Sequence, residues 1–86
     1  MDNHVEMQKN IHAIVGMIMV IVEDRDSVDI GFNAEGDNIT LTVTASPSDM
    51  GRIIGKQGAT ITSIRTIMKN IVCRNGKRYF LEVGLK

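Results

Sequence analysis

The chain has 86 residues and a mass of 9.5 kDa, which is enough for one small domain. It is 43% hydrophobic and 23% charged, a composition too apolar for a disordered tail and too polar for a protein embedded in a bilayer. Ten basic residues balance ten acidic ones, and an aromatic content of 3% without tryptophan argues against recognition by stacking of bases on aromatic rings.

The first apolar segment, residues 5–22, has two interpretations. As a strand, residues 17–22 are rich in β-branched side chains. As a helix, its apolar residues recur every three or four positions and form one broad face, made of Ile11, Ile14, Val15, Ile18, Met19 and Val22. Length and periodicity favour the helix. Its apolar stretch, residues 11–22, is too short to span a bilayer, which takes about 20 residues.

The next two segments alternate between apolar and polar residues, the pattern of half-buried strands. In the first, the apolar positions are Val28, Ile30 and Phe32. In the second, apolar residues alternate with threonines over residues 39–45. The turn-forming residues 34–37 lie between the two segments. We therefore expect a β-hairpin with one covered and one exposed face.

Two helices and a strand are predicted in the remainder. Ser46 and Pro47 suit the N-cap and first position of a helix, and Asp49 adds a carboxylate at its positive end. After a glycine-containing break, a second helix ending at Asn75-Gly76 is predicted by Ile61, Ile64, Ile67, Met68, Ile71 and Val72. The final strand alternates, with one face formed by Tyr79, Leu81, Val83 and Leu85. The order α-β-β-α-α-β predicts an α+β fold with helices packed on one face of a three-stranded sheet.

The break between the two predicted helices is Gly55-Lys56-Gln57-Gly58. Its glycines permit a sharp turn and the close approach of a ligand. Because a helix begins directly afterwards, we expect the N–H groups of Gly58, Ala59 and Thr60 to lack intrahelical acceptors, with Lys56 beside them. This arrangement suits a phosphate diester. A nucleotide-hydrolysing P-loop is excluded by the spacing, and Gly-x-x-Gly alone is more often a purely structural turn.

The residues around this loop resemble a known module. Residues 53–64 are similar to the signature of the KH domain, with two aliphatic residues before Gly-x-x-Gly and aliphatic residues at helical spacing after it. Residues 45–58, together with residues 64–66 and 76–78, resemble the small bacterial proteins that consist of one KH domain, the KhpA-like or YlqC-like family. The resemblance covers residues 11–84 and implies a type II-like KH fold. We therefore expect an N-terminal extension over residues 1–10 and a single KH domain over residues 11–86.

The resemblance implies a non-catalytic protein that binds single-stranded RNA, acting as an RNA chaperone or post-transcriptional regulator. The residues expected to bind RNA are Gly55, Lys56, Gln57, Gly58, Ala59, Arg52 and Ile54. Of the adjacent isoleucines, one is expected in the core, and we assign Ile54 to a groove that holds bases. Arg52 would attract the strand, whereas Arg65 fits attraction and simple solvation equally well. Single-stranded DNA is not excluded, because the motif does not read the 2′-hydroxyl.

Charge and partner expectations follow the same division of the chain. Residues 1–46 hold two basic and eight acidic residues, a net charge of −6, and residues 47–86 hold the reverse, a net charge of +6. This division suits the binding of a polyanion by the C-terminal half, and equally a chance segregation of charges that solvate two faces. The resemblance further implies a homodimer, or a heterodimer with a larger Jag-like KH protein.

Other functions find less support in the sequence. No Ser/His/Asp or Cys/His grouping indicates an enzyme, and no cofactor or metal site is expected. The single cysteine, Cys73, is expected in the core, and with no secretion signal the protein is expected in the cytoplasm, without a membrane. The alternative is a protein-interaction module with a purely structural Gly-x-x-Gly turn. A more remote one is an enzyme that binds a small phosphorylated metabolite.

Overall fold

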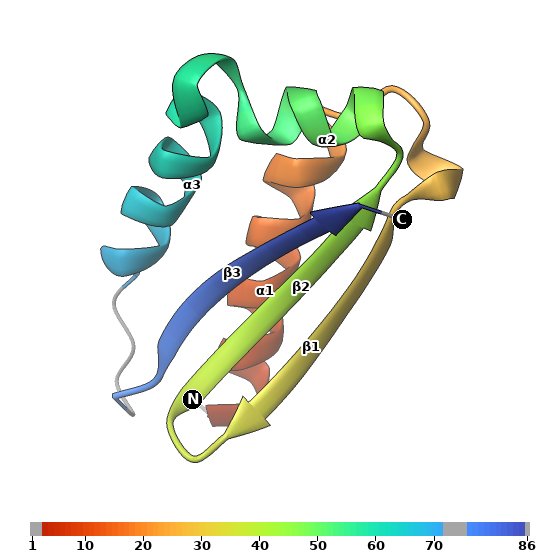
Figure 1. The fold of residues 1–86 in the computed structure, drawn as a ribbon. Coiled ribbons are helices and arrows are strands. Elements are labelled where there is room, and N and C mark those ends of the chain that lie inside the picture. Colours follow the sequence, from red (N-terminus) through yellow and green to blue (C-terminus); the bar gives the residue numbers. More distant parts are fainter. Residues whose placement is uncertain (1–2, 72–75, 86) are drawn as a thin grey trace.

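The computed structural model describes residues 3–71 and 76–85. In chain order its elements are α1 (Asn3–Met19), the 3-10 turn η1 (Arg25–Ser27), β1 (Asp29–Glu35), β2 (Asn38–Ala45), α2 (Pro47–Ile54), the 3-10 turn η2 (Lys56–Gly58), α3 (Ala59–Lys69) and β3 (Arg78–Leu85). The strands form one sheet, and the helices lie on one side of it (Figure 1). The predicted α-β-β-α-α-β order and the α+β class are confirmed.

The sheet has the order β1-β2-β3, with β2 antiparallel to β1 and parallel to β3. Leu41 in the centre pairs with Phe32 on one side and Leu81 on the other, so these three side chains share the face toward the helices. The threonines of β2 lie on the opposite face. Over the described residues β1 and β3 each pair with β2 on one side, and the outer edge of β3 is the one beside α3 in Figure 1.

The core fills the space between the sheet and the three helices. Alternate residues of β2, from Ile39 to Ala45, are fully buried, as the alternating pattern predicts. The helices add the apolar residues that their spacing placed on one face, namely Ile14, Ile18, Met50, Ile53, Ile61, Ile64 and Met68. The contacts between these helix residues and the buried residues of β2 fix how α2 and α3 lie on the sheet.

The first helix ends earlier than residue 22. α1 stops at Met19, where the Arg25 side chain donates from Nε to the Met19 carbonyl at 3.1 Å. Val20 is 75% exposed, while Val22 is buried after the turn. α1 also crosses residue 10 without a break, and Asn10 donates to the Tyr79 hydroxyl at 3.2 Å. Within the described ranges, no helix has the length and apolarity that crossing a membrane would need.

Two further boundaries correct the sequence analysis. The hairpin turn contains only Gly36 and Asp37, because residues 34 and 35 still pair with β2. α3 ends at Lys69 instead of Asn75-Gly76, and the Asn70 side chain donates to the Thr66 carbonyl at its end. The prediction for Ile67 is wrong, since its side chain is 52% exposed. The predictions for Val72 and Cys73 fall outside the described residues.

Candidate nucleic-acid interface

The loop between α2 and α3 has a backbone that only glycine adopts easily at its first position. Gly55 has φ 77° and ψ 173°, and Gly58 has φ 76°. A Cβ atom on Gly55 would lie 2.7 Å from the Thr60 Cβ and 2.8 Å from the Thr60 N. A Cβ atom on Gly58 would meet nothing within 4 Å. Gly55 is thus required by contact and by conformation, whereas Gly58 is favoured by conformation alone.

The hydrogen bonds of the loop correct one expectation. The Gly58 N–H donates to the Gly55 carbonyl at 3.1 Å, and the Ala59 N–H donates to the Lys56 carbonyl. These two groups are therefore not free, because the chain forms a 3-10 turn before α3 begins. Among the turn and loop hydrogen bonds of the described residues, none uses the N–H of Lys56 or Gln57. An anion contact through the Gly58 or Ala59 N–H would therefore have to replace one of these bonds, whereas the N–H groups of Lys56 and Gln57 are candidates for such a contact.

The side chains at the tip of the loop are accessible. Lys56 and Gln57 are both exposed, and Gln57 has a left-handed backbone with φ 57°. Ile53 is fully buried and Ile54 is 37% exposed, which confirms that one member of this pair belongs to the core and the other does not. Ala59 is also exposed. The loop thus presents one cation, one amide and an apolar residue at the junction of two helices.

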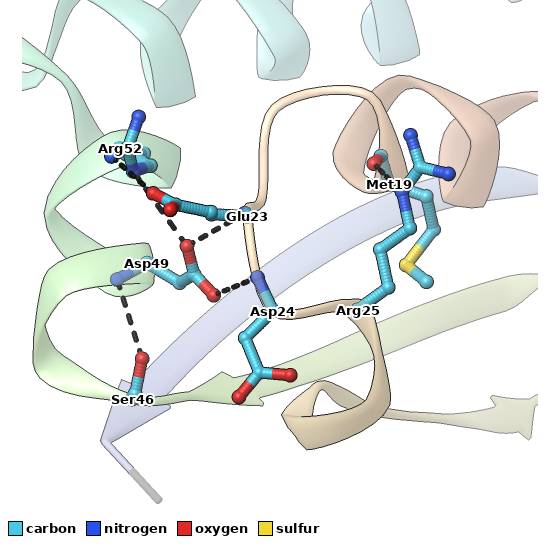
Figure 2. A network of polar contacts seen from close by, with 7 residues as sticks. All are labelled: Met19, Glu23, Asp24, Arg25, Ser46, Asp49 and Arg52. Atoms are coloured by element: carbon cyan, nitrogen blue, oxygen red, sulfur yellow. Dashed lines mark hydrogen bonds and ion pairs between the residues drawn. The ribbon is translucent and has the colours of Figure 1, made fainter.

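Arg52 lies one turn before the loop but is already paired (Figure 2). Its Nη2 lies 2.7 Å from Glu23 Oε2, and its Nε lies 3.7 Å from Asp49 Oδ1. The Arg52 and Glu23 side chains are 52% and 77% exposed. The sequence analysis expected Arg52 to attract the strand, and the structure adds that the acidic turn after α1 already supplies it with a carboxylate.

Asp49 connects α2 to that turn. Its side chain is 2% exposed, and its two carboxylate oxygens accept the Glu23 N–H at 2.9 Å and the Asp24 N–H at 3.0 Å (Figure 2). The hydrogen bond from Glu23 has the largest effect on the pKa of Asp49, and with the bond from Asp24 and the charge of Arg52 it outweighs burial and holds the pKa below its usual value of 3.8. The predicted cap is also present, since the Asp49 N–H donates to Ser46 Oγ at 3.4 Å.

The outer edge of β3 lies beside α3 and forms a second surface, besides the loop, that could contact a ligand. Arg65 donates from Nη2 to the Leu81 carbonyl at 2.9 Å, so its guanidinium is bonded to the strand edge. Since backbone groups alternate along a strand, those of Tyr79 and Val83 point to this edge as well. A cavity of about 470 Å³ is lined by Arg65 and Lys69 beside this edge and extends across Phe80 to residues of β1 and β2. Sequence reasoning missed this surface, because no local pattern shows which strand is at the edge.

Metal binding finds no support in the part of the chain that the structure describes. Over residues 3–71 and 76–85, no three His, Cys, Asp or Glu side chains come together as a metal site requires.

Comparison with known proteins identifies relatives over most of the chain. A family model described as KhpA/KhpB, KH domain, matches residues 12–83. Proteins named RNA-binding protein KhpA are 32% identical in Caldanaerobacter subterraneus subsp. tengcongensis, covering 73% of this chain and 84% of the relative, and 31% identical in Listeria monocytogenes, covering 81% and 92%. The protein of that name in Clostridium acetobutylicum is 33% identical, covering 73% and 84%. No solved structure matches the chain significantly.

Proposed function

The chain belongs to the KhpA/KhpB family of KH domains, and from this membership we propose that it is a non-catalytic protein that binds single-stranded RNA. The observation that carries the proposal is the exposed loop Gly55-Lys56-Gln57-Gly58 at the start of α3. The relatives carry the printed name RNA-binding protein, and the loop offers the type of contact that a nucleic-acid backbone needs.

In this proposal the loop holds one phosphate group of the strand. The N–H groups of Lys56 and Gln57 and the ammonium group of Lys56 donate to its oxygens, at the positive end of the α3 dipole. Gln57 reaches a neighbouring phosphate or sugar oxygen. Gly58 and Ala59 shape the turn and keep the strand close, since the first has no side chain and the second has a small one.

The bases would lie on the side of the loop that faces β3. Ile54 supplies an exposed apolar contact there, and backbone groups at the free edge of β3 meet the edges of bases. Arg65 already bonds this edge, so in our proposal it shapes the surface more than it attracts the strand. Recognition through backbone groups and few aromatic rings implies modest sequence preference.

A single domain of this kind is expected to bind RNA weakly, which favours assembly with a second domain. Each neutralised phosphate adds only about 0.7 to the salt slope of single-stranded binding, and the loop holds few phosphates. We therefore propose that the protein acts as a homodimer, or paired with a larger Jag-like KH protein, since linked modules gain avidity without new contacts. An RNA chaperone or post-transcriptional regulator in the cytoplasm is the role that such binding suits.

The experiment is the variant Lys56→Asp/Gln57→Asp, tested with a fluorescein-labelled, mixed-sequence RNA oligonucleotide. We expect binding to weaken roughly ten- to hundredfold, because hydrogen bonds to charged groups contribute about 1.5–3 kcal/mol each. The melting temperature should not change, since both side chains are exposed and aspartate tolerates the left-handed backbone of residue 57.

A matched control is Lys9→Asp/His12→Asp, which makes the same change in charge with neutral histidine. Both residues are exposed and lie in α1, an element separate from the loop. This control should lose little affinity. Equal loss in both variants would mean that only net charge matters, and unchanged binding in the loop variant would favour the protein-interaction module. DNA of the same sequence, run in parallel, determines whether the 2′-hydroxyl contributes.

A further inference from the structure

The ion pair between Arg52 and Glu23 joins two elements far apart in sequence. Arg52 is in the last turn of α2, three residues before Gly55, and Glu23 is in the turn between α1 and β1. The bond of 2.7 Å from Nη2 to Oε2 is short and charge-assisted. The two residues are 29 positions apart, so the pair exists only in the folded protein.

The position of Glu23 is fixed through its backbone. Its N–H is bound to the buried carboxylate of Asp49, which also holds the N–H of Asp24. The side chain of Glu23 therefore starts from a defined point beside α2, as Figure 2 shows, although its carboxylate is in solvent. Two other charges of the turn have different partners: Arg25 donates to the Met19 carbonyl, and the Asp24 carboxylate accepts from Ser27.

The two carboxylates at Arg52 differ in what a ligand could replace. Asp49 is 2% exposed and holds two backbone N–H groups, so no incoming anion can displace it without disrupting the turn. Glu23 is 77% exposed, and exposed ion pairs contribute little net stability. A phosphate group could take the place of Glu23 at Nη2 of Arg52 while the Nε side still faces Asp49.

We propose that Glu23 competes with the phosphate groups of the bound strand for Arg52, so that the turn between α1 and β1 sets the affinity and salt dependence of RNA binding. This inference rests on the proposed function and adds regulation of the same site. In the free protein Arg52 is held by Glu23. When the strand occupies the loop, its next phosphate reaches Arg52, and the carboxylate of Glu23 is released to solvent.

The competition predicts the behaviour of Glu23→Gln. Without the carboxylate, Arg52 is free to bind phosphate, so RNA should bind about two- to fivefold more tightly at low salt, the range that corresponds to an exposed ion pair. The slope of log affinity against log salt should become steeper by up to about 0.7, as one more phosphate is neutralised without release of a carboxylate. The gain should disappear at high salt, where such charges are screened.

The test compares four variants with the wild-type protein on the same fluorescein-labelled RNA oligonucleotide across a salt series. Asp26→Asn is the matched control, because it removes one exposed carboxylate from the same turn. It should tighten binding less than Glu23→Gln and leave the salt slope unchanged. Arg52→Gln should weaken binding, and the double variant Glu23→Gln/Arg52→Gln should bind no more tightly than Arg52→Gln alone. Melting temperatures should match for Glu23→Gln and wild type, since the backbone N–H that Asp49 accepts is retained.

Four outcomes would overturn the proposal. Equal gains for Glu23→Gln and Asp26→Asn would show that general charge is responsible. If Glu23→Gln still raises the RNA affinity when Arg52 is replaced, Glu23 and the phosphate do not compete for Arg52. Loss of RNA binding in wild type and all variants alike would reject the RNA-binding function itself, whereas wild-type binding with no effect of Glu23→Gln would reject the competition alone.

Discussion

Two junctions lie beside α2, namely the Gly55–Gly58 loop that follows it and the turn between α1 and β1, and they are stabilised by different means. At its C-terminal end, the Gly55–Gly58 loop turns through backbone conformation and leaves Lys56 and Gln57 exposed. On its other side, Asp49 holds the turn after α1 through two backbone hydrogen bonds, and Glu23 of that turn is paired with Arg52. The first junction keeps its polar groups for a ligand, and the second uses them to build the fold.

Several basic side chains of the C-terminal half are already bonded within the protein. The basic C-terminal half suggested a surface of similar cations, but Arg52 is paired with Glu23 and Arg65 is bonded to the edge of β3. Lys56 is the exposed cation at the loop itself. Local pairing, more than net charge, therefore indicates where a phosphate would bind first.

The largest effect is expected from a substitution in the loop whose backbone depends on glycine. Gly55→Ala should lower the free energy of unfolding by about 2–4 kcal/mol, because the new methyl group collides with Thr60 and the backbone at φ 77° and ψ 173° is unfavourable for alanine. Gly58→Ala should cost only about 1 kcal/mol, since it adds the left-handed backbone without a collision. Urea denaturation of both variants measures the difference. Equal losses would show that the contact with Thr60 relaxes at little cost.

The next effect tests the junction that depends on side chains. Asp49→Asn should lower the melting temperature by several degrees at neutral pH, because one amide oxygen replaces a carboxylate that accepts from two N–H groups. The pKa of Asp49 is depressed in the folded protein, so its contribution is fully present above the unfolded value of 3.8 and is lost as the pH falls through the folded pKa. Melting curves of wild type and variant should therefore converge below pH 3.8. A difference that stays constant down to the lowest pH would contradict the role of the charge.

The smallest effect concerns the end of α1 in the same junction. Arg25→Gln removes both the hydrogen bond to the Met19 carbonyl and a positive charge at the C-terminus of the helix. It should cost about 0.5 kcal/mol in the free energy of unfolding, as measured by urea denaturation. Arg25→Lys keeps the charge and should lose less. If both variants lose the same amount, the hydrogen bond rather than the charge stabilises this end.

The alternating and helical patterns predicted the elements well and their ends poorly. Alternation in β2 and helical spacing in α1 and α3 identify core residues such as Leu41 and Ile64, since burial follows the period of each element. Ile67 fits the same spacing but is exposed, because the sheet covers only part of that face of α3. The helix ends depend on groups such as Arg25, whose partner lies six residues back and leaves no pattern in the sequence.

By itself the sequence determined the α-β-β-α-α-β order and the glycine loop, because both follow from local conformation and periodicity, whereas the assignment of Ile54 over Ile53 to the groove was a preference that periodicity did not decide. Only the tertiary structure decided which amides of the loop are bonded, that Asp49 holds the turn after α1, and that Arg52 is paired with Glu23. The amide bonds of the loop join residues only three positions apart and depend on its backbone conformation, whereas the contacts of Asp49 and Arg52 with the turn after α1 join residues 25 or more positions apart. Such proximity arises from packing around the core, which no short stretch of the chain encodes.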